Sequence, residues 1–313
     1  YGLDFIFAFL AAALPWIFCA VYFIAVLKTN WQEAFLVGVF AAPTSAGILF
    51  AMLAAAGLGT TWLFRKAQVL AVFDDFAALL LLIPLQMIFI GLKPGLFLAV
   101  FFMAGFLVLA FRWLHSFQIP TGRHWLILYG MLIVVARYFV YGITKMDLGV
   151  LLPAFAFGAV LYNPHLHKAK DVSYDKSHQE PICVRFFMMD RFIKGFFMFL
   201  VGCSLPKMQL VGVSAAAFIG HVLALTVLSN LGKCFLFFCY PKEASWKNRL
   251  ALSIAMFPRG EVGAGVLLIA MGYGLGGLAV SLSILSLALN LVLTGGFIAL
   301  AIGLGQPQKV AAK

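Results

Sequence analysis

Two adjacent carboxylates, Asp74 and Asp75, stand in an apolar run that covers residues 71–90. A run of this length spans a bilayer, and each charge inside it costs about 2.5–3.5 kcal/mol on insertion scales. This cost falls if the carboxylates are paired, wet or protonated, so the pair predicts a site that holds protons or cations. The alternative is that both side chains reach the membrane surface or cap a helix that starts at Phe76. The mostly apolar residues 67–73 argue against a cap.

Polar residues also interrupt two other apolar runs. Residues 41–47 read Ala-Ala-Pro-Thr-Ser-Ala-Gly, and residues 256–263 read Met-Phe-Pro-Arg-Gly-Glu-Val-Gly. Proline removes a backbone donor, and broken backbone persists in a membrane only where protein buries it or where it lines a wet cavity. Matching interruptions in two halves indicate the binding site of a transporter, although simple proline kinks are the alternative. The polar residues at these interruptions are Thr44, Ser45, Arg259 and Glu261.

These residue types favour the binding of a hard alkali cation, which prefers oxygen ligands. The carboxylates of Asp74 and Asp75, the hydroxyls of Thr44 and Ser45 and the freed carbonyls around Pro43 supply such oxygens. A carboxylate holds a cation or a proton, but not both at full occupancy. The set therefore predicts competition between a cation and protons for one site.

The composition defines the class of protein that positions this site. The chain has 313 residues, of which 64% are hydrophobic and 11% are charged, unlike a soluble domain. Its apolar stretches are continuous runs of about 20 residues, which indicates membrane-spanning helices and not a β-barrel. The net charge of +11 lies mostly between the runs, where basic residues set orientation, so we expect no nucleic-acid partner.

Breaks at polar, proline and glycine clusters divide the chain into ten predicted spans. They cover residues 5–27, 34–57, 67–91, 95–114, 125–144, 148–162, 188–205, 208–231, 250–272 and 276–303. The predicted organisation is a first half over residues 1–161, a cytoplasmic linker over 162–185, a second half over 186–304 and a short tail over 305–313. The linker holds His165, His167 and His178, for which a solvated loop is favoured over a metal site because no cysteine or tight histidine spacing completes one.

The ten spans predict the orientation of the chain. Most basic residues then fall on one side of the membrane, and only Lys28, Lys93, Lys145 and Lys207 fall on the other. Both ends of the chain are therefore expected in the cytoplasm. An uninterrupted span, then an interrupted span and then a third span follow one another over residues 5–91. The same order occurs again over residues 208–303. The second set is offset by seven spans and so is inverted, which is typical of transporters with discontinuous helices.

Several motifs resemble the monovalent cation:proton antiporter family, the Kef/NapA-like sodium/hydrogen exchangers. The first interruption is similar to its Thr-Ser-x-Gly-Ile motif, and Asp74 with Asp75 resembles its paired aspartates. The segment Phe-Phe-Met-Phe-Leu-Val-Gly-Cys-Ser-Leu over 196–205 resembles its Phe-rich motif. Lys233 resembles its lysine in the third-to-last helix, and Arg-Gly-Glu over 259–261 resembles its second crossing helix.

The resemblance implies an antiporter fold with two crossing discontinuous helices, of which the first two helices are absent from this chain. In the family those helices belong to a scaffold that carries a homodimer interface. It also implies an integral multi-pass protein of a bacterial-type inner or plasma membrane, surrounded by lipids, that transports Na⁺ or K⁺ and H⁺ and needs no cofactor. Na⁺ at Asp75 and Asp74 is favoured, because related potassium systems carry Gln-Asp there. Lys233 is expected near Asp74 as an internal counter-ion or a proton carrier, which would make the exchange electrogenic. The resemblance leaves Glu261 or one of the aspartates as the partner of Arg259.

Two other classes use similar residues. An intramembrane aspartyl protease needs two facing carboxylates, but neighbouring residues on a helix diverge by about 100°. The chain is therefore not expected to be an enzyme and has no predicted catalytic residue. A channel or a sodium-coupled symporter on a related fold remains open, and a flux of cations without coupled proton movement would favour it.

Overall fold

The structure, a computed structural model, describes residues 2–90, 123–144 and 214–305, together with a few single residues between 192 and 203. Every regular element within these ranges is a helix. Five of the described helical stretches are long and apolar enough to cross a membrane. The protein is therefore an all-α polytopic membrane protein, which confirms the class predicted from composition.

The chain divides into two compact units, one formed by residues 1–89 with 196–313 and the other by residues 90–195. In the second unit the structure describes α6 (Arg123–Thr144), which coincides with the predicted span 125–144. The first unit contains all the residues of the predicted site. The predicted spans 95–114 and 148–162, most of 188–205 and the linker with its histidines lie outside the described residues. The count of ten spans, the inverted repeat and the predicted halves therefore stay predictions.

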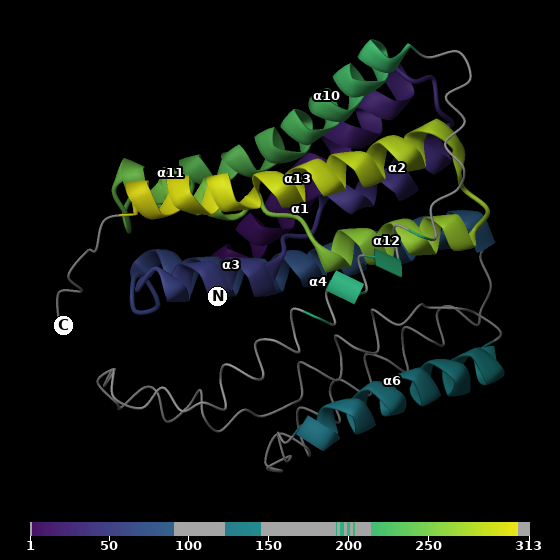
Figure 1. Ribbon diagram of the computed structural model, residues 1–313, viewed down its shortest axis with the longest axis horizontal. Helices are drawn as coiled ribbons and strands as arrows, with labels where there is room; N and C mark the ends of the chain where they lie inside the picture. The colour runs from purple at the N-terminus through teal and green to yellow at the C-terminus, as the bar shows by residue number, and fades with distance from the viewer. Residues whose placement is uncertain are drawn as a thin grey trace. The chain divides into compact units, whose positions relative to one another are not determined.

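Within its described residues, the first unit contains four long helices and two series of short ones (Figure 1). The long helices are α1 (Gly2–Ala25), α4 (Trp62–Ile90), α10 (Ala215–Lys233) and α13 (Gly277–Leu304). The first short series is α2 (Trp31–Gly38), the 3₁₀-helix η1 (Val39–Ala41) and α3 (Ala46–Ala55). The second is the 3₁₀-helix η3 (Cys234–Phe238), α11 (Trp246–Ala255) and α12 (Glu261–Gly272).

Both predicted interruptions are present, at residues 42–45 and at 256–260. Each contains a proline, which cannot donate the hydrogen bond that would continue the helix. The two unwound segments meet, because the Ser45 amide donates a hydrogen bond of 2.8 Å to the Pro258 carbonyl. Figure 1 shows the unwound link that separates α11 from α12. The first break thus donates a hydrogen bond to a free backbone carbonyl of the second, and buried backbone in a membrane requires such a partner.

Glycine lets the two breaks approach closely. A Cβ at Gly260 would lie 2.6 Å from the Ser45 Oγ, and a Cβ at Gly263 would lie 2.8 Å from the Phe40 carbonyl oxygen. Both distances are shorter than real Cβ contacts. The absence of side chains at these positions therefore allows α12 to pack on η1 and on the first break.

The helices α1 and α13 fix the position of α10, which ends at Lys233. A Cβ at Gly232 would clash with Pro15, so α10 and α1 pack closely at this level. On its other side, α10 meets α13 through a hydrogen bond of 3.0 Å from Asn290 Nδ2 to Asn230 Oδ1. Polar bonds of this kind help to associate helices within a membrane and define how they are rotated.

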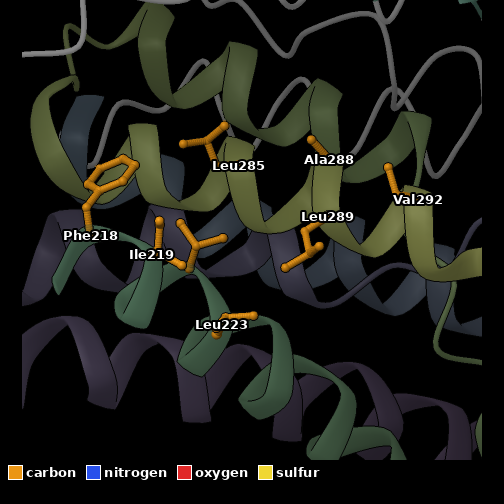
Figure 2. A pocket seen from close by; sticks show the side chains of 8 residues that line it. Phe218, Ile219, Leu223, Leu285, Ala288, Leu289 and Val292 are labelled. Carbon is orange, nitrogen blue, oxygen red and sulfur yellow. The ribbon is translucent and has the colours of Figure 1, made fainter. Parts of the chain in front are cut away.

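An apolar groove of about 400 Å³ lies between α10 and α13 (Figure 2). Only hydrophobic side chains line it, among them Phe218, Leu223 and Leu289. Such a lining offers no oxygen to a cation, so the groove is distinct in chemistry from the predicted site.

Candidate functional site

Asp74 lies at the centre of a closed set of interactions, which we call the paired half of the site (Asp74, Thr44 and Lys233). The Asp74 side chain is fully buried, and each of its two oxygens accepts a hydrogen bond. Lys233 Nζ donates to Oδ1 over 2.6 Å, and Thr44 Oγ1 donates to Oδ2 over 2.8 Å. The negative charge of Asp74 is therefore compensated within the protein.

The first interruption also contributes backbone oxygens to the paired half. Lys233 Nζ donates a second hydrogen bond, of 2.8 Å, to the carbonyl of Ala42, which no longer serves a helix. Thr44 Oγ1 lies 3.1 Å from the Met256 carbonyl in the second break. The predicted freeing of carbonyls around Pro43 is thus observed, and one of them holds the buried lysine.

Asp75 has a different environment and belongs to what we call the open half of the site (Asp75, Ser45 and Glu261). Its Oδ1 is buried and has no hydrogen-bond partner among the described residues. It interacts electrostatically with Asp74, Glu261 and Lys233. Ser45 Oγ donates to Glu261 Oε2 over 3.1 Å, and the structure records no such bond between Ser45 and Asp75. The open half holds two carboxylates without an ion-pair partner in the described part of the chain.

Arg259 is bound by backbone carbonyls. Its Nη1 donates to the carbonyls of Ala42 and Pro43 over 3.2 and 3.1 Å, and its Nη2 donates to the carbonyl of Ser229 over 2.8 Å. The side chain is only 1% exposed. Arg259 therefore places a positive charge on the carbonyl end of η1 and links both interruptions to α10, in agreement with the charge preference of a helix C-terminus.

The structure brings six of the seven predicted site residues into two hydrogen-bonded sets across the breaks, and it places Asp75 beside them. Sequence reasoning missed the carbonyls of Ser229 and Met256 as acceptors. No side-chain pattern signals these oxygens, because any residue type carries a carbonyl. Their use follows from the close packing at Gly232 and Gly260, which the sequence does not specify.

A second polar cluster joins α1, α4 and the segment before α11. Lys66 Nζ lies 3.0 Å from Asp4 Oδ1 and 3.0 Å from Glu243 Oε2, and the Tyr240 hydroxyl donates to Asp4 Oδ1 over 2.6 Å. Burial, followed by the hydrogen bond to Asp4, raises the pKa of Tyr240, so its hydroxyl stays protonated. The helix α4 begins at Trp62, earlier than the predicted span that starts at residue 67, and Lys66 is paired inside this helix.

The fold and the site define a polytopic helical membrane protein with a buried charge cluster at the contact of two interrupted helices. Comparison with protein families supports this class of protein. The family model described as sodium/hydrogen exchanger, transmembrane, matches residues 4–302, and the chain belongs to this family. No curated protein matches the chain with significant similarity. The protein is therefore an integral membrane cation:proton antiporter, and its family is a family of transporters, not of enzymes.

Proposed function

We propose that this antiporter exchanges Na⁺ for protons at Asp75 by alternating access. The observation that carries the proposal is the contrast between two neighbouring carboxylates: Asp74 is neutralised by Lys233, whereas Asp75 has a buried oxygen without a hydrogen-bond partner among the described residues. An uncompensated carboxylate in a membrane interior is costly unless it binds a proton or a cation. Exchange of one for the other keeps this cost low throughout the cycle.

The mechanism follows from the competition at this carboxylate. A proton on Asp75 is released when Na⁺ binds, and the cation is ligated by oxygens of Asp75 and of the first interruption, with water completing the shell. Protonation on the other side of the membrane expels the cation again. Because the site lies at the contact of two discontinuous helices, a movement of these helices exposes it to one side at a time.

Lys233 provides a route to an electrogenic cycle. Its ammonium is held by Asp74 and by the Ala42 carbonyl in a site without water exposure, since the side chain is fully buried. A Na⁺ ion next to Asp74 competes with this ammonium for the same negative charge. If Lys233 then releases a proton, two protons are exchanged for one Na⁺ and each cycle moves one net charge. If it keeps the proton, Lys233 is only the counter-ion of Asp74.

The test is a flux assay on proteoliposomes with a pH dye in the lumen. Addition of NaCl outside is expected to change the lumenal pH, whereas choline chloride is not. KCl and LiCl added in turn rank the cations, and Asp75→Asn is the negative control. The absence of a response to every alkali cation in the wild type would contradict the proposal. A cation flux without proton movement would favour a channel instead.

Solid-supported membrane recordings test the electrogenic part. A Na⁺ jump is expected to give a current in the wild type and none in Lys233→Gln, which keeps polarity but loses the titrating charge. An unchanged current in Lys233→Gln would refute the role of Lys233 as proton carrier. No current in either protein would show an electroneutral exchange.

The assembly is proposed from the family resemblance and the distribution of charge. We infer a homodimer in a bacterial-type inner membrane, with both ends of this chain in the cytoplasm. The excess of basic residues on one side of the predicted spans supports this orientation. Labelling of an added C-terminal cysteine from one side of oriented vesicles tests it, because only reagents on the cytoplasmic side should react.

A further inference from the structure

We propose that a polar seam between α10 and α13 positions Lys233 for its pairing with Asp74. The seam consists of two hydrogen-bonded pairs of buried side chains, Thr226 with Ser286 and Asn230 with Asn290. These four act as positioning residues: they touch neither the cation nor the proton, and they act through Lys233. The inference rests on the proposed exchange, in which the pair of Lys233 and Asp74 takes part.

Both pairs of the seam have the same register. Thr226 Oγ1 lies 2.9 Å from Ser286 Oγ, and Asn290 Nδ2 donates to Asn230 Oδ1 over 3.0 Å. The two residues of each pair are 60 positions apart, so α10 and α13 run parallel here and meet again after about one turn. None of the four side chains is more than 9% exposed. Two directional contacts therefore define the rotation and the height of α10 relative to α13.

The seam ends close to Lys233, which lies three residues after Asn230 and is the last residue of α10. Residues three apart are neighbours on a helix surface, so a rotation fixed at Asn230 also fixes the direction of Lys233. This direction matters, because Nζ reaches Asp74 Oδ1 over 2.6 Å and the Ala42 carbonyl over 2.8 Å. A rotated α10 would move the ammonium away from at least one of these acceptors.

Helix α13 acts on Lys233 without a charge of its own, since it has no ionisable residue between Gly277 and Leu304. The ionisable groups that face α10 in the described part of the chain belong to α1, α4, η3 and the second break. They are Cys19, Tyr22, Asp74, Asp75, Cys234 and Arg259. An effect of the seam on the pH dependence of transport is therefore exerted through the position of Lys233.

A seam that only associates two helices makes different predictions. Asn290 Oδ1 is buried and has no hydrogen-bond partner among the described residues, so this pair is not chosen for stability alone. Replacing both partners of a buried hydrogen bond by apolar residues of similar shape is often neutral for stability. Asn230→Leu with Asn290→Leu should therefore fold, although the directional contact is lost. Ser283→Ala is the matched control, because this buried hydroxyl of α13 donates to the Ala279 carbonyl of its own helix.

The experiment is a double-mutant cycle on the melting temperature of the purified full chain. Asp74→Asn is introduced into the wild type, into the double leucine variant and into Ser283→Ala. In the double leucine variant the pair of Lys233 and Asp74 is already weakened, so Asp74→Asn should lower the melting temperature by at most about half of the decrease in the wild type. The Ser283→Ala background should show the full decrease. A full decrease in the double leucine variant would overturn the inference.

The pH profile of Na⁺/H⁺ exchange in proteoliposomes gives a second readout. An ammonium that Asp74 holds less firmly gives up its proton more readily, so the double leucine variant should shift the profile by about one pH unit toward lower pH. Ser283→Ala should keep the wild-type profile, and an unshifted profile in the double leucine variant would refute the positioning role.

Two further outcomes are distinguishable. Should the double leucine variant fail to fold, Asn290→Ser replaces it, because the shorter side chain does not reach Asn230 and the same two readouts decide. A wild-type protein that does not exchange Na⁺ for protons would refute the proposed function, whereas the melting cycle, which involves no transport, would still decide whether the seam positions Lys233.

Discussion

The paired half and the open half of the site begin from adjacent residues of one helix and differ in their hydrogen bonds. Both oxygens of Asp74 accept hydrogen bonds, one of them from an ammonium group, whereas Asp75 keeps a buried oxygen without a hydrogen-bond partner in the described part of the chain. Neighbouring residues on an α-helix point about 100° apart, so the two carboxylates face different surroundings. The protein therefore compensates the charge of Asp74, and we propose that Asp75 binds a proton or a cation.

Replacing Asp75 should have the largest effect on transport. Asp75→Asn removes the cation ligand and the proton site together, so we expect exchange to fall to the level of empty liposomes. The melting temperature should not fall, because the change removes a buried charge that has no counter-ion. Normal cation-driven pH changes in this variant would remove Asp75 from the mechanism.

Replacing Asp74 should have a large effect on stability, in contrast to the replacement of Asp75. Asp74→Asn leaves the buried Lys233 without its counter-ion, and breaking a buried pair in this way costs about 3–5 kcal/mol. The double variant Asp74→Asn with Lys233→Gln removes both charges and should recover much of the melting temperature. Equal melting temperatures of the single variant and the wild type would show that the pair contributes little to the fold.

The hydroxyls of the first break should have intermediate effects. Thr44→Ala removes the hydrogen bond to Asp74, and Ser45→Ala removes the one to Glu261. The loss of about 1 kcal/mol corresponds to about a fivefold weaker apparent affinity for Na⁺. We expect the maximal rate to change less, because the proton site remains. A fall in maximal rate with unchanged affinity, measured from the Na⁺ dependence of flux, would exclude both hydroxyls as ligands.

A substitution in the second polar cluster, away from the site, should have the smallest effect on transport. Tyr240→Phe removes the hydroxyl that donates to Asp4, which should lower the unfolding free energy by about 1 kcal/mol and leave the affinity for Na⁺ unchanged. Because the pKa of Tyr240 is raised, its contribution is complete below about pH 10 and is lost as the pH rises through the raised value. The melting difference from wild type should therefore be equal at pH 6 and pH 9. A changed affinity for Na⁺ would connect this cluster to transport.

The sequence predicted the features that depend on residue type. The apolar runs predicted the helices, the prolines at 43 and 258 predicted the two breaks, and the cost of charge in a membrane marked Asp74 and Asp75. The expectation that Lys233 lies near Asp74 came from the family resemblance, and the structure places the two side chains 2.6 Å apart. Residue types alone do not select Asp74 over Asp75, because that choice depends on the rotation of α4 relative to α10. The rotation of α10 is fixed by its contacts with α1 and α13, which involve residues distant in sequence.

The partner of Arg259 was unpredictable for a related reason. Sequence reasoning pairs an arginine with a carboxylate, and Glu261 was the nearest one. The structure instead offers carbonyls at an interrupted helix end, and it turns Glu261 toward Ser45. Backbone acceptors leave no trace in residue types, so only the arrangement of the two breaks reveals them.

The most direct test of the account measures protons released when Na⁺ binds to the purified protein. The chain is placed in a weakly buffered detergent solution with a pH dye, and NaCl is added against a choline chloride control. The wild type should acidify the solution on addition of NaCl, and Asp75→Asn should not, although it is folded by its melting curve. Equal proton release from both proteins would contradict the claim that a proton and a cation compete for Asp75.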